Sequence, residues 1–306
     1  MSRSPYRRNL INFRDYNQTR LDCAAQISPD KARIAFDVIP YLLHTNHRDL
    51  PGYVEGSDAP WGIYLFEPDE NVVESLRRYC PGFNLDKAES FRRVDRLMIE
   101  SLFIMGSIGT VGQTKKSDYD YWVVIDESKI SPEDVRELEA KLAALEMWCL
   151  EKKMESHFFL SDVSKTKDNE FGVTDKESGG SAQKQILKEE FYRTAILIKG
   201  KTLLWWLTPP GISDEEYEEH KNNLLDEGYI DENEVIDLGP ISHIPPGELF
   251  GALLWQFNKA MESPYKSVIK MGLMESYIME GENAELLCDT LKRHVQGGAG
   301  QDRKLD

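Results

Sequence analysis

A glycine-serine pair and two alternating aspartates lie close together in the middle of the chain. Gly106 and Ser107 end an apolar run, and Asp118 and Asp120 follow after a short loop. In a β-strand, residues i and i+2 point to the same side and lie about 6.5 Å apart, at roughly 3.3 Å per residue. Two carboxylates so placed can share a hard cation, and without one their repulsion costs stability. The spacing therefore indicates a divalent metal site.

The surrounding residues suit the phosphates of a nucleotide. Mg²⁺ is commonly held by one or two carboxylates together with substrate phosphates. Gly106 has no side chain to keep phosphate oxygens from the backbone, and Ser107 adds an N–H and a hydroxyl there. Lys115 and Lys116, on the loop before Asp118, could balance phosphate charge. Each feature alone is also typical of an ordinary turn or a solvated surface, but in this order they predict a triphosphate site with two Mg²⁺ or Mn²⁺ ions.

The residues around this motif predict two parallel strands joined by a helix. Ser131 can cap the helix and Pro132 fits its first position. A strand, a helix of this length and a second strand form a crossover, so both strands should start at the same edge of the sheet. The three strand-like runs are SLFIMGSIG, DYDYWVVID and ESHFFLSD.

The parallel arrangement predicts where a third carboxylate should lie. Glu155, at the start of the last run, should be adjacent to Asp118 and Asp120. His157 shares its face, and Asp162 lies at the far end of the same run. Glu155 is therefore the first candidate for a third metal ligand, with the other two as alternatives.

Composition limits the class of protein. The 306 residues include 37 Lys plus Arg and 53 Asp plus Glu, a formal net charge of −16. Polynucleotide binding usually requires a basic face, so we expect no nucleic-acid partner. No secretory signal or apolar run of roughly 20 residues is evident, so we expect no membrane span and a cytoplasmic location. The four dispersed cysteines show no zinc spacing.

The chain divides into four expected segments. We expect a mostly helical segment at 1–89, a catalytic core at 90–210, a helical domain at 211–295 and a disordered tail at 296–306. Other expected elements are strands at Trp61 to Phe66 and Lys201 to Pro209, and helices at Phe91 to Glu100, Glu215 to Asp226, Glu248 to Met261 and Tyr265 to Met279.

At the level of whole segments, the chain resembles the class I adenylate cyclases, the enterobacterial type. The resemblance is carried by GSIGTVGQTKKSDYDYWVVID, IPYLLHTNHRDLPGYVEG, EEFYRTAILIKGKTLLWW and LFGALLWQFNKAMESPYKSVIK, and it covers nearly the whole chain. It implies an α+β fold of the DNA polymerase beta-like nucleotidyltransferase type, a mixed sheet with flanking helices, plus a helical C-terminal region. Larger family members continue into a C-terminal regulatory region, so a regulatory protein or domain is a further partner to consider.

The resemblance also implies roles for individual residues. Gly106 and Ser107 match the phosphate-binding dipeptide of the superfamily, and Asp118 and Asp120 match its metal-binding aspartates. Trp122 matches an aromatic position of the family, as a contact to the base or ribose or equally as a core residue.

Three residues further along the chain are weaker candidates for nucleotide contacts. The resemblance places the SGGS segment that ends at Ser181 near the nucleotide, with Lys184 after it, and a plain linker is the alternative. Arg193, on an expected helix, is a candidate triphosphate contact, or else pairs with neighbouring acids.

The resemblance implies the reaction, which the motif alone does not. ATP would be converted to 3′,5′-cyclic AMP and pyrophosphate by attack of its ribose 3′-hydroxyl on its own α-phosphorus at two metal ions held by Asp118, Asp120 and Glu155. The alternatives are transfer of AMP to a protein or small-molecule hydroxyl, and a non-catalytic nucleotide sensor.

Overall fold

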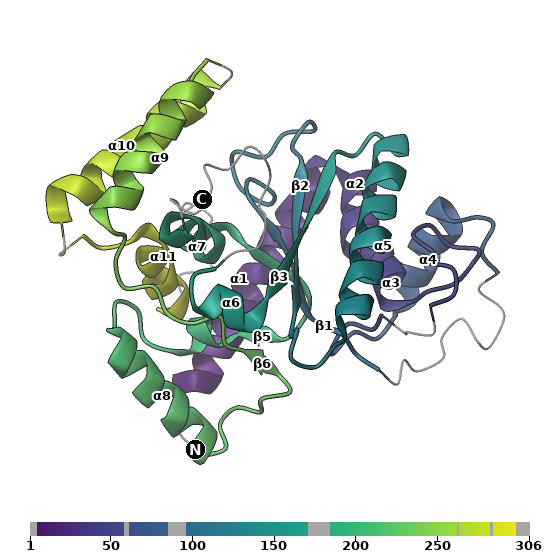
Figure 1. Cartoon of the computed structure of the whole chain (residues 1–306), viewed down its shortest axis with the longest axis horizontal. Helices are drawn as coiled ribbons and strands as arrows, with labels where there is room; N and C mark the ends of the chain where they lie inside the picture. The colour runs from purple at the N-terminus through teal and green to yellow at the C-terminus, as the bar shows by residue number, and fades with distance from the viewer. Residues whose placement is uncertain are drawn as a thin grey trace.

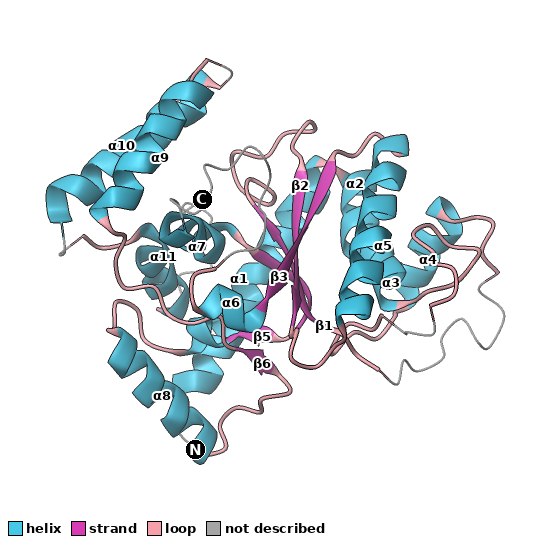
Figure 2. Ribbon diagram, viewed as in Figure 1, coloured by secondary structure: helices cyan, strands magenta, loops and turns pink. Residues whose placement is uncertain are grey.

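A mixed four-stranded sheet forms the centre of the molecule. The computed structural model describes residues 5–57, 61–84, 96–170, 184–261, 263–281 and 284–297. The strand order is β3-β2-β1-β4, with β2 parallel to β3 and β1 antiparallel to both β2 and β4 (Figure 2). The strands are β1 (Ile99–Met105), β2 (Tyr119–Ile125), β3 (Ser156–Asp162) and β4 (Ile196–Gly200). The α+β class and the mixed sheet are confirmed.

The expected crossover connects β2 to β3 through α5 (Pro132–Glu151). The Ser131 hydroxyl accepts a hydrogen bond from the Asp134 amide, and the Asp134 carboxylate accepts one from the Ser131 amide. The two residues thus form a capping box. The parallel register then places Tyr119 opposite Ser156. Both strands therefore begin at one edge of the sheet, as predicted.

The two faces of the sheet are covered by different helices (Figure 1). Side chains alternate along β2, so that Tyr121 and Val123 enter one core while Trp122 and Val124 enter the other. The first core is closed by α2 (Pro29–Arg33), the π-helical η1 (Ile34–Val38), α3 (Ile39–His44), α4 (Glu70–Tyr79) and α5. The second is closed mainly by α1 (Pro5–Ile27), α7 (Lys184–Thr194) and α11 (Leu287–Gln296).

The C-terminal third of the described chain is mainly helical. Its longer helices are α8 (Asp214–Asp226), α9 (Pro246–Lys259) and α10 (Pro264–Glu280), and the last two form a hairpin that projects from the body (Figure 1). These three helices match the expected ones. Smaller elements are α6 (Val163–Lys167), the parallel pair β5 (Thr202–Leu203) and β6 (Val235–Ile236), and the 3₁₀ helix η4 (Leu204–Leu207).

Three expected elements differ from the structure. The helix expected from Phe91 to Glu100 is wrong at its end, because Ile99 and Glu100 begin β1, while 85–95 lie outside the described residues. The run from Trp61 to Phe66 contributes only a single bridge between Ile63 and Ile99. The run from Lys201 is a strand for two residues and then turns into η4, because both tryptophans pack into the second core.

Among the described residues, no helix combines the length and the hydropathy needed to cross a bilayer.

Candidate active site

The two aspartates and the glycine-serine turn meet at one edge of the sheet. Asp120 lies opposite Met105, the residue before Gly106, in the antiparallel register of β1 and β2. Asp120 shares the face of Trp122 by strand alternation, and it is half-buried. Asp118 lies two residues earlier, just outside β2, and is exposed. The central juxtaposition expected from the sequence is therefore present.

The turn is held to the loop that carries the first aspartate. The Ser107 hydroxyl donates to the Ser117 hydroxyl at 3.1 Å, next to Asp118. Gly106 has a φ of +106°, a conformation that strongly favours glycine, and a Cβ there would meet no described atom within 4 Å. The turn thus presents open backbone beside the aspartates, although the Gly106 amide itself donates to the Thr194 hydroxyl at 3.1 Å.

The start of β3 adds an acidic and an imidazole side chain to this edge. The Tyr119 amide donates to the Glu155 carbonyl at 3.0 Å, and His157 lies opposite Asp120. The His157 Nε2 lies 3.8 Å from the Glu155 carboxylate, which is exposed. Asp162 is at the other end of β3, where its side chain accepts the Lys165 and Glu127 amides.

These carboxylates suit a cation that is completed by substrate oxygens. Asp118, Asp120 and Glu155 carry carboxylates at neighbouring positions where two adjacent strands begin. In the part of the chain that the structure describes, no three acidic, histidine or cysteine side chains are close enough to hold a metal together. Mg²⁺ frequently uses only one or two carboxylates and takes its other ligands from phosphates and water. The donor set therefore fits a metal-nucleotide complex better than a metal bound alone.

The three lysine candidates lie on two segments, the loop before Asp118 and the start of α7. Lys115 and Lys116 are exposed on the loop before Asp118. The Lys115 carbonyl accepts a hydrogen bond from the Lys31 ammonium of α2 at 2.9 Å. Lys184 begins α7 and lies 3.9 Å from the Glu170 carboxylate. Ser181 lies outside the described residues.

Trp122 and Arg193 have partners within the protein. Trp122 is 2% exposed, and its ring centroid lies 4.9 Å from that of Phe191, so it occupies the core position that was the alternative to a base or ribose contact. Arg193 donates through Nε to Glu189 at 3.1 Å, the ion-pairing alternative. Burial raises the pKa of Glu189, an effect that the neighbouring Arg193 opposes. Trp122 therefore belongs to the second core, and Arg193 is paired within α7.

Buried groups beneath the turn could not be identified from the sequence. Arg20 of α1, 2% exposed, donates from Nη2 to the Ile108 carbonyl at 2.7 Å and to the Thr194 carbonyl at 3.1 Å. Gln113 accepts the Gly109 amide at 2.7 Å and is itself buried. No local pattern singles out Arg20, because 88 residues separate it from Ile108.

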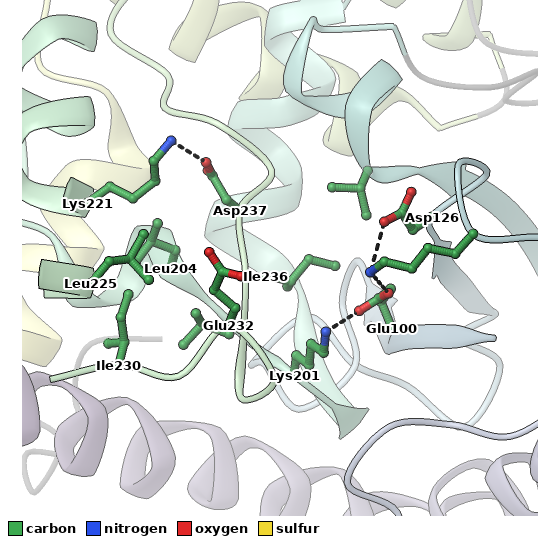
Figure 3. A pocket seen from close by; sticks show the side chains of 13 residues that line it. Glu100, Asp126, Lys201, Leu204, Lys221, Leu225, Ile230, Glu232, Ile236 and Asp237 are labelled. Carbon is green, nitrogen blue, oxygen red and sulfur yellow. Dashed lines mark hydrogen bonds and ion pairs between the residues drawn. The ribbon is translucent and has the colours of Figure 1, made fainter. Parts of the chain in front are cut away.

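A cavity of about 260 Å³ lies at the opposite end of the sheet (Figure 3). Much of its charged lining is paired: the Lys201 ammonium lies 2.5 Å from the Glu100 carboxylate, and the Lys129 ammonium lies 2.9 Å from both the Glu100 and the Asp126 carboxylates. Lys221 pairs similarly with Asp237 at 3.3 Å. At this end of the sheet, Glu100, Lys201 and Lys129 therefore neutralise one another within the chain.

Comparison with known proteins identifies the family. Residues 8–206 match the family model described as the adenylate cyclase NT domain, and residues 244–306 match that of the class-I adenylate cyclase second domain. Adenylate cyclases of Shigella flexneri, Proteus mirabilis and Yersinia pestis are 36%, 35% and 34% identical over 92%, 95% and 92% of this chain. The chain spans about a third of their length, 33% of each. No solved structure matches it at a significant level. The chain belongs to the class I adenylate cyclase family.

Proposed function

We propose that this chain is the catalytic region of an adenylate cyclase, which converts ATP to 3′,5′-cyclic AMP and pyrophosphate. The observation that carries the proposal is the meeting of the Gly106–Ser107 turn with Asp118 and Asp120 at one edge of the sheet. Family membership supports the substrate and the product, because the full-length relatives are named adenylate cyclases. We further propose that the sheet is of the DNA polymerase beta-like nucleotidyltransferase type.

In the proposed reaction, one ATP molecule supplies both reacting groups. The ribose 3′-oxygen forms a bond to the α-phosphorus, the bond from that phosphorus to the bridging oxygen of pyrophosphate breaks, and the hydroxyl proton is released. Intramolecular attack requires only that the ribose be held against its own phosphate, so positioning supplies much of the rate enhancement. No second substrate is needed.

Acidic and basic residues have different proposed roles: the carboxylates bind cations, and the lysines and the turn bind phosphates. Asp118 and Asp120 would hold the divalent cations, with Glu155 as the third carboxylate on the adjacent strand. Bound Mg²⁺ or Mn²⁺ would lower the pKa of the attacking hydroxyl and offset negative charge on the departing pyrophosphate. The open backbone at Gly106 and Ser107 would receive phosphate oxygens, and Lys115 and Lys116 would approach them from solvent. Lys184 and Arg193 stay weaker candidates, because each has a carboxylate neighbour.

Product identification tests the proposal directly. Purified protein is incubated with ATP and Mg²⁺ or Mn²⁺, and the products are identified by mass spectrometry. Cyclic AMP with pyrophosphate supports the proposal, an adenylylated acceptor would indicate nucleotidyl transfer, and binding without turnover would indicate a sensor.

A substrate analogue provides the matched control. 3′-Deoxy-ATP keeps the triphosphate but lacks the attacking oxygen, so it should bind and yield no cyclic product. 2′-Deoxy-ATP keeps that oxygen and should yield cyclic 2′-deoxy-AMP. Release of pyrophosphate from 3′-deoxy-ATP would contradict attack by the 3′-hydroxyl.

A further inference from the structure

A buried arginine lies directly beneath the glycine-serine turn. The Arg20 side chain reaches from α1 to two carbonyls, that of Ile108 in the turn at 2.7 Å and that of Thr194 at the end of α7 at 3.1 Å. Its Nη1 donates to the Tyr16 hydroxyl at 2.8 Å. Thr194 also accepts the Gly106 amide through its own hydroxyl. One guanidinium therefore connects both segments that position the turn.

The turn approaches Arg20 as closely as the backbone allows. Gly109 has a φ of +73°, and a Cβ there would lie 2.4 Å from the Arg20 carbonyl oxygen and 3.1 Å from its Nε. Any other residue would push the turn away from α1. The close contact makes the position of the turn depend on the position of Arg20.

The positive charge of Arg20 has no carboxylate partner in the described part of the chain. Its hydrogen-bond acceptors among the described residues are two carbonyls and a phenol, and its buried Nε has no acceptor there. A buried cation costs free energy unless it is paired, and the negative end of the α7 dipole offsets only part of that cost. A polyanion bound on the turn would supply the missing negative charge in a partly dry environment, where the attraction is stronger than in water.

We propose that Arg20 is a positioning residue for the triphosphate, an inference that rests on the proposed function. It holds the Gly106–Ser107 turn against the end of α7, and its uncompensated charge favours polyphosphate on the open side of that turn. Arg20 acts from beneath the turn, through the backbone of Ile108, rather than as a catalytic residue.

The test compares a charge-keeping and a charge-removing substitution. Arg20→Gln removes the charge and Arg20→Lys keeps it, and binding of 3′-deoxy-ATP with Mg²⁺ is measured by titration calorimetry. We expect Arg20→Gln to weaken binding by about tenfold and Arg20→Lys by about threefold or less. Without nucleotide, the unfolding midpoint of Arg20→Gln should fall by no more than about 4 °C, because lost hydrogen bonds are offset by removal of a buried charge.

Lys31→Gln is the matched control for the loss of one positive charge. Lys31 contacts the outer side of the same loop, at the Lys115 carbonyl, where solvent screens it. This control should change the dissociation constant by about twofold or less. If Arg20→Gln fails to fold, Arg20→Met, which keeps the volume without the charge, replaces it.

Two outcomes would overturn the proposal. In one, Arg20→Gln binds 3′-deoxy-ATP as tightly as the wild type; in the other, both Arg20 variants lose thermal stability while the folded protein keeps its affinity. Cyclic AMP formation by the wild type is followed separately, so that failure of the reaction and failure of the Arg20 inference are distinguished.

Discussion

The two ends of the central sheet differ in their charges: one end pairs opposite charges, and the other gathers two acidic side chains. At the cavity end, the Glu100 and Lys201 side chains are 4% and 6% exposed and pair directly at 2.5 Å. At the turn end, Asp118 is exposed and Asp120 half-buried, and both are acidic. The same strands β1 and β2 reach both ends (Figure 2). The difference teaches that opposite charges paired within the chain contribute to the fold, whereas like charges gathered at an exposed edge are placed where a substrate could reach them.

The largest expected effect is on catalysis at the turn end. Asp118→Asn or Asp120→Asn should lower cyclic AMP formation by about 10³-fold or more, because each removes a metal-binding charge. For Asp118→Asn, the free energy of unfolding should stay the same or rise, because Asp118 is exposed and its repulsion from Asp120 is relieved. Activity by mass spectrometry and urea denaturation measure the two effects. Near wild-type activity in either variant would contradict the assignment of Asp118 and Asp120 as metal ligands.

At the cavity end, the same kind of substitution should act on stability instead. Glu100→Gln leaves Lys201 buried without its carboxylate and should lower the free energy of unfolding by about 3–5 kcal/mol. The turnover of the folded protein should change by about twofold or less. The matched control is Glu127→Gln, which breaks the exposed pair with Lys165 and should cost about 1 kcal/mol or less. Equal losses of unfolding free energy in Glu100→Gln and Glu127→Gln would contradict the distinction between the buried and the exposed ion pair.

Lys141 tests what a buried cation costs when, among the described residues, its ammonium forms no ion pair with a carboxylate. It donates to the Gly52 carbonyl at 3.0 Å, and burial lowers its pKa to about 7. The folded state thus binds fewer protons than the unfolded state between about pH 7 and the ordinary lysine pKa of 10.5. Stability should therefore rise with pH across this window because of Lys141, by at most about 1.4 kcal/mol per pH unit.

Lys141→Met should remove this part of the slope in denaturation measured from pH 7 to 10. Lys292, whose pKa burial also lowers to about 7, lies in the second core and should keep its own contribution. Combining Lys141→Met with Lys292→Met should flatten the curve further, because the two sites are independent. An unchanged slope in Lys141→Met would contradict the lowered pKa.

The smallest expected effect comes from the exposed lysines of the loop. Replacing Lys115 and Lys116 together with Gln should weaken ATP binding by about two- to fivefold at low salt, since both are exposed. The difference from the wild type should shrink as salt rises and the Debye length falls to about 8 Å near physiological ionic strength. Titration calorimetry at two salt concentrations measures this. A loss that salt does not reduce would indicate direct, partly buried contacts instead.

Local signals predicted the elements that carry their own start and stop residues. Ser131 and Pro132 marked the beginning of α5, and the strands on either side of it have the expected parallel order. The helix expected at Phe91 to Glu100 is wrong at its end because apolar spacing does not exclude a buried strand, and Ile99 is wholly buried beside β2. Short apolar runs are ambiguous until their neighbours in the sheet are known.

The candidate site was predictable only where its residues are close in sequence. Gly106, Ser107, Asp118 and Asp120 lie within one strand-loop-strand segment, so their spacing is informative. Arg193 could as well have reached a phosphate, and only the buried Glu189 one helical turn away shows that it pairs within α7. Ser181 lies outside the described residues, so its expected role stays a prediction.

The sequence by itself determined the acidic motif, the crossover that aligns Glu155 with it, and membership of a family, because these depend on short spacings and residue identity. The tertiary structure alone decided that Trp122 packs against Phe191 and that Arg20 lies beneath the turn. Those contacts join segments tens of residues apart, and burial in a shared core selects them. A local sequence pattern does not predict which distant segment will pack against it in the core.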